Sequence, residues 1–311
     1  MAAQQAGAAR AFDIDERHPP IRTRRVSFDW EKTPLHWIPG DPVGTHVVNS
    51  FHTVLPAGER WFVQCVKDAL PQVLDARLRA EIQGFIGQEM VHARSHQGVL
   101  DELLDRHGID VRPITRAADR GNEERPAAML ELACRAPRKY RRRLRFELGA
   151  VAAIEHYTAV LGQWILDNDR LDAAGADPTM LDLLRWHGAE EVEHRSVVFD
   201  VYRHLGGGYL MRVAAWAVSL AFLYYALVGG SVYLVRRDPT LGGRMAPWRI
   251  YRAYRRSVRA GHIPGIFRLL VVEALVYLRP WHHPSRVCST PQALAYLTRS
   301  PAALAAGYDP Y

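Results

Sequence analysis

Apolar side chains recur at helical spacing in several segments of the chain, where they border clusters of charged residues. Phe62 and Val66 lie on one stripe of LPAGERWFVQCVKDAL, and Trp186 and Val197 border the charged part of LLRWHGAEEVEHRSVVFDVY. At about 100° per residue, such spacing puts the apolar positions on one side of an α-helix. The pattern predicts an all-α protein whose core is formed by four helices between about residues 56 and 205.

Outside this core the pattern changes. Residues 1–20 are predicted to be a disordered tail, and residues 20–50, rich in Pro, Gly and Trp, an irregular arm laid on the bundle. The polar residues 108–127 are predicted to connect two helices. The bundle and its arm would occupy residues 21–205, and residues 206–311 would add further helices.

One apolar run is long enough to cross a lipid bilayer. Residues 213–235 contain no charged residue, and the glycines of HLGGGY immediately precede them. A helix of this length extends about 35 Å, compared with about 30 Å for the hydrocarbon core of a bilayer. Because three glycines favour a hinge, we expect this helix to leave the bundle. The alternatives are a helix buried against the bundle or in a homodimer interface.

The segment after this run is rich in arginine. RMAPWRIYRAYRRSVRAG interleaves arginine with Trp and Tyr, as helices at membrane interfaces do, whereas Arg268 and Glu273 argue against a second span in GIFRLLVVEALVYL. The chain has a net charge of +7 and a pI of about 9.5. No nucleic-acid-binding motif accompanies the basic patches. An anionic membrane surface therefore explains these patches at least as well as nucleic acid does, and solvated helix faces are the default alternative.

The cysteines and the N-terminal residues predict a cytoplasmic protein. Cys65, Cys134 and Cys288 form no C-x-x-C motif, and their odd number argues against a disulfide framework. The first residues contain no apolar segment of a secretory signal. We expect reduced thiols and a cytoplasmic location, with membrane association or one transmembrane helix left open.

The charged clusters contain two pairs of the metal-ligand type. Glu89-x-x-His92 and Glu191-x-x-His194 each present a carboxylate and an imidazole on one side of a helix, a spacing found in di-metal helix bundles. Such a bundle also needs one glutamate from each of two further helices. Gaps of 30 and 36 residues between each candidate glutamate and the pair that follows it suit two antiparallel helix hairpins. The candidates are Glu59 and Glu155.

Both of these glutamates have alternatives. Glu59 could be an acidic residue favoured by the dipole at a helix start. Glu155 lies among alanines and an isoleucine, where an unpaired carboxylate is costly to bury, which favours a cation partner. Glu147 could nevertheless be the ligand in its place.

Other polar residues fall on the same helix faces as the two pairs. His187 lies four residues before Glu191 and is a candidate seventh ligand, although it could instead support a ligand or lie at the surface. His96 lies one turn beyond His92 and is predicted to line the pocket or support a ligand. Glu190 is the alternative to Glu191 as a ligand, and it is predicted to accept a hydrogen bond from a metal-binding histidine.

Four motifs together resemble a bacterial family of predicted metal-dependent hydrolases, over about residues 20 to 290. They are LHWIPGDPVGTHVVNSFHTVLPAGERWF, GQEMVHARSH, WHGAEEVEHRSVVFDVY and YLRPWHHP. The ligand pattern is similar to that of ferritin-like di-iron carboxylate proteins, which implies a ferritin-like four-helix bundle with additional C-terminal helices. His187-x-x-x-Glu191-x-x-His194 further resembles the extra-histidine pattern of arylamine N-oxygenases. That likeness covers metal ligands alone and implies no substrate.

The ligand set limits the metal and the reaction. Four carboxylates and two or three imidazoles without a thiolate disfavour structural zinc, so we expect two iron ions, with manganese or zinc as alternatives. The sequence contains no glycine-rich phosphate loop and no serine nucleophile elbow. We expect a di-iron oxidase or oxygenase that uses O2 on a small organic substrate. The alternatives are a hydrolase with a bridging water and a non-catalytic, membrane-associated metal-binding protein.

Overall fold

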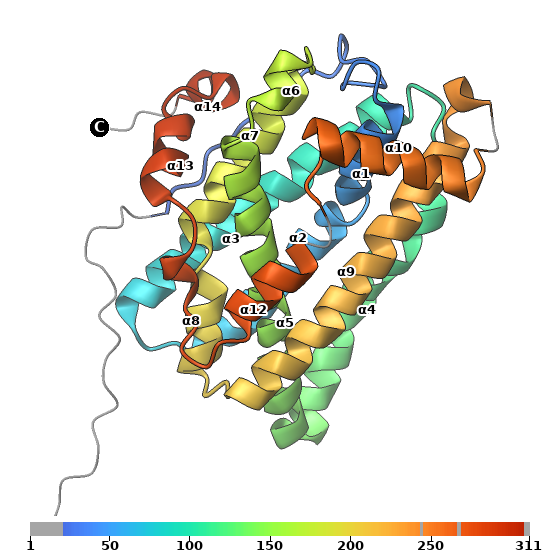
Figure 1. Ribbon diagram of the computed structural model, residues 1–311. Helices are drawn as coiled ribbons and strands as arrows, with labels where there is room; N and C mark the ends of the chain where they lie inside the picture. The colour runs from blue at the N-terminus through green and yellow to red at the C-terminus, as the bar shows by residue number, and fades with distance from the viewer. Residues whose placement is uncertain (1–20, 243–244, 266–268, 308–311) are drawn as a thin grey trace, which may run out of the picture.

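Helices make up all the regular structure in the part of the chain that the structure describes. The computed structural model describes residues 21–242, 245–265 and 269–307, and it contains no strand within them. The predicted tail lies outside the described residues. The expectation of an all-α protein is confirmed (Figure 1).

Four long helices lie at the centre of the molecule and pack as two pairs (Figure 1). The first pair is α2 (Leu55–Ala69) with α3 (Ala76–Gly98), and the second is α5 (Pro137–Leu166) with α7 (Pro178–His194). These are the helices in which the sequence places the candidate ligands. The helices of each pair are joined through η1 (Leu70–Gln72) and α6 (Arg170–Ala173), respectively.

Aspartate caps explain where the second helix of each pair begins. Asp75 precedes α3, and its side chain accepts a hydrogen bond from the N–H of Leu78 at 2.7 Å. Asp177 does the same for the N–H of Met180 at 2.9 Å before α7. Such caps satisfy one of the N–H groups that lack a partner at a helix start. They therefore set the start of both helices that carry a Glu-x-x-His pair.

The helices α5 and α7 approach each other closely at two glycines. A Cβ atom on Gly188 would lie 2.6 Å from the Cα atom of Gly162, too close for any side chain. Both positions therefore need glycine. The contact brings the two helices together near Glu155 and Glu191, which lie about two turns and one turn away along them.

Two expectations for the connecting segments need revision. The arm is irregular from residue 21, but it ends at α1 (Pro42–His52). The segment 108–127 was expected to be a connection, which is wrong, because most of it belongs to α4 (Arg112–Arg135). This helix is polar because most of its sides face solvent; Arg125 and Met129 are its buried residues.

The helix of the second Glu-x-x-His pair ends earlier than its apolar pattern suggests. The sequence pattern predicts a helix that continues to about Tyr202, but α7 ends at His194, and α8 (Val197–His204) follows it. The guanidinium group of Arg195 is buried at this turn and donates a hydrogen bond to the carbonyl oxygen of Pro284 at 3.0 Å. The turn is thereby tied to the C-terminal segment, a long-range contact with no local signal in the sequence.

The apolar run forms α9 (Tyr209–Arg237), and the preceding glycines form the expected break, with a φ of +79° at Gly206. The expectation that this helix leaves the bundle is wrong, because it packs along α5 and α1 (Figure 1). The hydroxyl of Ser219 donates to the carbonyl oxygen of Ala150 at 3.3 Å. α9 is long and apolar enough to cross a membrane, and only 22% of its most apolar stretch is buried inside the protein. Its structure is compatible with a soluble or a membrane-associated protein.

After α9 the chain covers two sides of the bundle (Figure 1). α10 and α12 lie on the same side as α9, whereas α13 and α14 pack on α7. Asp182 of α7 holds the second group, because it accepts hydrogen bonds from Tyr296 and Ser300, both at 2.8 Å. The bounds of the remaining elements are η2 (Val99–Leu104), η3 (Pro239–Leu241), α10 (Pro247–Ala260), η4 (Leu269–Glu273), α12 (Ala274–Tyr277), η5 (Pro284–Arg286), α13 (Thr290–Leu297) and α14 (Pro301–Ala305).

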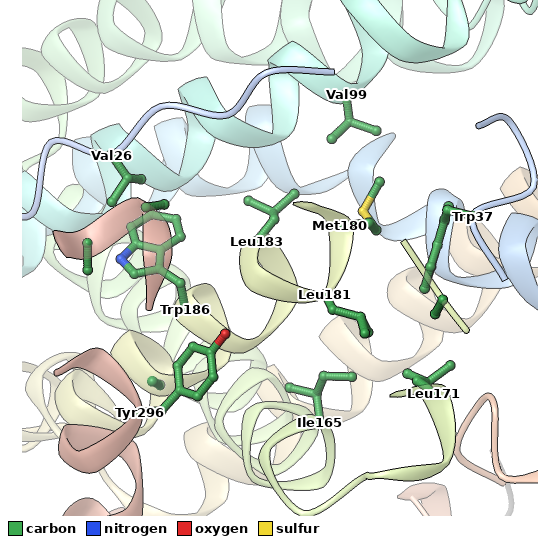
Figure 2. Packing of buried hydrophobic residues seen from close by; sticks show 14 of the residues in the cluster. Val26, Trp37, Val99, Ile165, Leu171, Met180, Leu181, Leu183, Trp186 and Tyr296 are labelled. Atoms are coloured by element: carbon green, nitrogen blue, oxygen red, sulfur yellow. The ribbon is translucent and has the colours of Figure 1, made fainter. Parts of the chain in front are cut away.

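Buried apolar side chains join α7 to the arm and to α13. Figure 2 shows Met180, Leu183 and Trp186 of α7 in one cluster with Val26 of the arm and Tyr296 of α13. Fully burying a side chain such as Leu or Met contributes roughly 1.5–3 kcal/mol to folding. The arm and the C-terminal helices therefore share a core with the bundle.

Candidate metal centre

Four helices bring acidic and imidazole side chains together inside the bundle. α2 and α5 each supply one glutamate, α3 and α7 each supply a Glu-x-x-His pair, and α7 adds a further histidine. All seven side chains are buried. They are the seven candidate ligands proposed from the sequence: Glu59, Glu89, His92, Glu155, His187, Glu191 and His194.

The seven residues fall into two adjacent groups. Within each group, one nitrogen or carboxylate oxygen per residue lies within 4.8 Å of the corresponding atoms of the others. Atoms that bind one ion at about 2.0–2.2 Å have similar mutual separations. The first group is Glu59, His92 and His187, and the second is Glu89, Glu155, Glu191 and His194.

Helical spacing accounts for the contacts within α3 and α7. Nδ1 of His92 lies 3.0 Å from Oε1 of Glu89, and Nε2 of His194 lies 3.5 Å from Oε1 of Glu191. His187, about one turn earlier on α7, places its Nε2 2.8 Å from the same oxygen of Glu191. Five of the seven positions thus follow from residue spacing on two helices.

Contacts between helices join the two groups. Nε2 of His194 lies 3.2 Å from Oε2 of Glu155 and 3.4 Å from Oε1 of Glu89. Nδ1 of His92 lies 3.5 Å from Oε1 of Glu191. Glu89 and Glu191 therefore each approach histidines of both groups. Their carboxylates lie between two candidate ion positions.

Several carboxylate oxygens of the cluster are buried without a hydrogen-bond partner among the described residues. They are both oxygens of Glu59, both of Glu155 and Oε2 of Glu89. Burying an ionised carboxylate is strongly unfavourable unless it is paired or binds a metal. Four carboxylates would balance the charge of two divalent ions. Oxygen and nitrogen donors without a thiolate also fit such ions.

Burial and mutual charge displace the pKa values in this cluster. Burial, followed by repulsion from Glu89, raises the pKa of Glu59 well above its usual value. Burial, followed by the charge of Glu191, raises the pKa of Glu155 to about 8. Burial alone would lower the pKa of His194, but Glu191 and Glu155 raise it well above its usual range. Protons thus offset the negative charge, and bound cations would replace them.

The outward-facing nitrogen of each Glu-x-x-His histidine has a fixed partner. Nε2 of His92 donates to Oε2 of Glu190 at 2.9 Å, and Nδ1 of His194 donates to Oε1 of Gln88 at 2.9 Å. Gln88 and Glu190 directly precede the glutamates of the two pairs, so each helix orients the histidine of the other. Such hydrogen bonds fix the tautomer and the ring orientation, leaving the inner nitrogen free to bind.

An arginine of the N-terminal arm extends this network. The buried Arg24 donates to Glu190 at 2.9 Å and to Glu193 at 2.8 Å, and Nε2 of Gln88 donates to Glu193 at 2.6 Å. Neither Arg24 nor Gln88 is among the residues proposed from the sequence. A signal for Gln88 did exist, because a polar residue precedes each Glu-x-x-His pair. The sequence around Arg24 carries no such signal.

A row of three histidines leads from the cluster to α1. Nδ1 of His187 and Nε2 of His96 are 2.7 Å apart, and the Nδ1 atoms of His96 and His52 are 2.8 Å apart. Burial lowers the pKa of His96, and it lowers the pKa of His52 to about 3. The structure therefore places His96 as the support of His187 and outside both groups. No pattern in the sequence singles out His52.

The rival carboxylate on α5 lies elsewhere. Glu147 accepts hydrogen bonds from Nε of Arg125 at 3.0 Å and from Nε of Arg143 at 2.9 Å. It belongs to none of the ligand groups in the described part of the chain. Glu155, about two turns further along α5, is the carboxylate at the cluster.

A narrow cavity reaches the cluster from the side of α1. Its volume is about 100 Å³, and its wall includes His187, Glu191 and Thr158, as well as His52 and Phe51. The hydroxyl of Thr158 donates a hydrogen bond to the carboxylate of Glu191. The rest of the wall is mainly apolar, so a small molecule that approaches the cluster through this cavity meets mainly apolar side chains.

A third group of titratable residues lies apart from the cluster. Nε2 of His36 and Nε2 of His46 lie 2.6 and 2.8 Å from Oδ2 of Asp238, and Thr240 donates to the other oxygen. This carboxylate is already satisfied by neighbouring donors. Hydrogen bonding between the arm, α1 and the end of α9 accounts for the group without an ion.

Comparison with protein families matches most of the chain. Residues 22–287 match the family described as "Predicted metal-dependent hydrolase", and this range contains all seven clustered residues. Comparisons with curated proteins and with solved structures find no match. The family description agrees with metal dependence, and it fits the hydrolase alternative better than the expected oxidase. The chain belongs to the predicted metal-dependent hydrolase family.

Proposed function

We propose that the clustered residues hold two divalent metal ions in a ferritin-like four-helix bundle. Glu59, His92 and His187 would bind one ion, and Glu155 and His194 the other. The remaining two glutamates lie between the groups and would bridge the ions. The observation that carries this proposal is the set of five buried carboxylate oxygens that lack a hydrogen-bond partner within the described chain.

We further propose iron as the metal and O2-dependent oxidation of an apolar substrate as the reaction. Bound iron would supply oxygen activation, for which a carboxylate-rich helical site is suited. The chain itself excludes bulk water, because all seven ligands are buried. Gln88 and Glu190 hold the two Glu-x-x-His imidazoles with their inner nitrogens toward the ions.

The wall of the narrow cavity favours oxidation over hydrolysis. Metal ions could polarise the reacting oxygen of a carbonyl or phosphoryl substrate, but hydrogen-bond donors in the wall would be expected to recognise its other polar groups. The Thr158 hydroxyl is already directed at Glu191, and most other groups in the wall are apolar. An unactivated hydrocarbon group needs no such donors.

Hydrolysis remains the second candidate, because the family description favours it. In that case a water molecule between the two ions would be the nucleophile, and the bridging glutamates would hold the ions at the required separation. The same seven ligands would serve both reactions, so the ligand geometry alone does not separate them.

Metal analysis followed by two activity assays tests the proposal. Protein from iron-replete cells is expected to contain two iron ions per chain and to consume O2 when ferrous iron and a reductant are supplied. Hydrolysis of esters or phosphoesters by an anaerobic, zinc- or manganese-loaded sample, without O2 consumption by the iron form, would establish the second candidate instead. Two bound metals with neither activity would leave a metal-binding protein without catalysis.

A further inference from the structure

The exposed apolar side chains are concentrated on one face of the molecule. Among the described residues, all but four of the large apolar side chains with high exposure lie between Tyr209 and Trp281. Patches of this kind mark interaction sites more often than ordinary surface. α9 contributes Leu210, Val218, Phe222 and Tyr225, and the four exceptions are Leu74, Met90, Leu130 and Leu304.

The same face is strongly basic. Among the described residues from Tyr209 to Trp281, eight arginines are exposed, whereas the two acidic residues are Asp238, which is buried, and Glu273, which is half-buried. Asp238 is buried and accepts hydrogen bonds from His36 and His46, so it does not offset the arginines at the surface. A surface that is both apolar and basic complements an anionic lipid leaflet.

The helix α10 combines aromatic and basic side chains at this surface. Trp248 and Tyr251 are 55% and 59% exposed. The guanidinium groups of Arg249 and Arg252 lie 5.3 and 5.7 Å from the Trp248 ring centre, and Arg255 lies 5.9 Å from that of Tyr251. Helices that lie in a membrane interface have this composition.

A large cavity opens on this face and leads toward the metal centre. Its volume is about 490 Å³, within the usual range for small-molecule sites, and its wall is mainly apolar. The exposed side chains of Tyr224, Val228 and Tyr251 form part of the wall at the surface. It shares with the narrow cavity beside Glu191 the residues Val48, Phe51, Leu55, Thr158, Leu161 and Pro264.

We propose that the substrate is a long-chain membrane amphiphile, which enters the large cavity while α9 and α10 lie on an anionic leaflet. The apolar chain would point toward the cluster, and this step rests on the proposed function of the metal centre. α9 would lie along the leaflet rather than cross it, because one of its sides packs along α5 and α1. The arginines of α10 would contact the phosphate groups.

Vesicle sedimentation tests the docking face. The full chain is expected to bind vesicles of phosphatidylcholine with phosphatidylglycerol about tenfold more strongly than vesicles of phosphatidylcholine alone. Phe222→Ser combined with Tyr225→Ser should weaken binding to the anionic vesicles about tenfold, because both side chains are exposed on α9. Neither residue lines the large cavity. Leu74→Ser, at an exposed position away from this face, is the matched control and should bind as the parent does.

Fatty-acid binding tests the cavity separately. cis-Parinaric acid fluoresces in apolar surroundings, and its fluorescence is expected to rise saturably when it is titrated with the full chain. Leu227→Trp fills the large cavity from α9 and should weaken this binding about tenfold while leaving vesicle binding unchanged. Val218→Trp, which also introduces a tryptophan on α9 but at an exposed position outside the cavity, is the control and should bind parinarate as the parent does.

Three results would overturn the proposal. They are equal binding to both kinds of vesicle, vesicle binding that survives the paired serine change, and parinarate binding that survives Leu227→Trp. If the serine change instead converts a dimer into a monomer without altering vesicle binding, the face joins two copies of this chain. The lipid measurements need no metal, so Glu155→Ala should leave them unchanged. Failure of the proposed metal centre would appear separately, as metal retained in that variant.

Discussion

The bundle interior and the outer face of α9 and α10 are unusual in opposite ways, because charged groups are buried in the first and apolar groups are exposed on the second. The interior buries carboxylates such as Glu59 and Glu155, several of whose oxygens lack a hydrogen-bond partner within the described chain. The outer face exposes large apolar side chains such as Phe222 and Tyr225. A buried carboxylate is unfavourable unless it is paired or binds a cation, and an exposed apolar patch is unfavourable unless a partner covers it. Bound cations would neutralise the buried carboxylates, and an apolar phase would cover the exposed apolar side chains.

The two regions also differ in how firmly the rest of the chain holds them. The two Glu-x-x-His histidines are oriented by the hydrogen bonds that they donate to Gln88 and Glu190 on the opposite helices. The exposed side of α9 packs against nothing in the described structure. Substitutions inside should therefore impair metal binding or folding, whereas substitutions outside should affect binding alone.

Removal of one buried carboxylate should have the largest effect. Glu155→Ala is expected to reduce the metal content from two ions per chain to at most one, because the second group loses one of its three carboxylates. Glu147→Ala is the matched control on the same helix. It should lower stability, since it leaves Arg125 buried without its main partner, yet both ions should remain. Metal analysis measures the number of ions in each variant, and circular dichroism shows whether the variant is folded. Loss of metal from the Glu147 variant instead of the Glu155 variant would make Glu147 the ligand.

The two regions should also differ in how much a single substitution lowers the free energy of unfolding. Trp186→Ala removes a fully buried ring from the core cluster and should lower the free energy of unfolding by about 3–5 kcal/mol. Tyr225→Ser, at an 80% exposed position on α9, should change it by about 0.5 kcal/mol or less. Urea unfolding measures both. A large loss of stability in the Tyr225 variant would mean that the outer face is part of the folding core.

The spacing of residues on single helices was enough to predict much of the candidate site. The Glu-x-x-His pairs lie on two helices, and the gaps to Glu59 and Glu155 matched the two helix pairs that the structure contains. The choice between Glu155 and Glu147 stayed open because both lie on α5. Arg125 of α4 donates a hydrogen bond to Glu147. This partner was not predicted, because α4 is exposed on most sides and its polar sequence does not show the pattern of a packed helix.

The sequence pattern did not predict the contacts between residues that are far apart in the chain. Arg24 reaches Glu190 from an irregular arm, and His52 reaches His96 from a helix that was assigned to that arm. The apolar run was correctly expected to be a helix separated from α8 by glycines. Its hydropathy does not reveal that one side packs along α5 and α1 while the other stays exposed, because both sides are apolar.

A pH-dependent change is expected where the C-terminal segment is buried beside the bundle. Burial, followed by His156 and Arg212, lowers the pKa of His282 to about 3, against about 6.5 in an unfolded chain. The unfolded chain therefore binds this proton more readily. The stabilising contribution of the neutral ring is complete above about pH 6.5 and is lost as the pH falls, by up to about 1.4 kcal/mol per pH unit. His282→Phe should flatten the stability profile between about pH 6 and 4.

Thermal unfolding at several pH values measures this change, with His204→Phe as the control at an exposed histidine. An unaltered profile in the His282 variant would show that the ring does not stay neutral in the folded protein. Because His282 contacts Phe199 and Tyr277, phenylalanine fits its surroundings. The variant should therefore fold at neutral pH.

The smallest effect is expected at His187, where the buried cluster meets the cavity. Its Nε2 lies 2.8 Å from Glu191 and 3.6 Å from Glu59, and its ring also lines the narrow cavity. His187→Ala should keep both ions, because six other ligands remain, but it should shift the visible spectrum of the iron form or change its reactivity. His96→Ala removes only the support of His187 and should give a smaller shift in the same direction. An unchanged spectrum and rate in a folded His187 variant would place this histidine outside the metal centre, and loss of both ions would make it a ligand that the cluster needs.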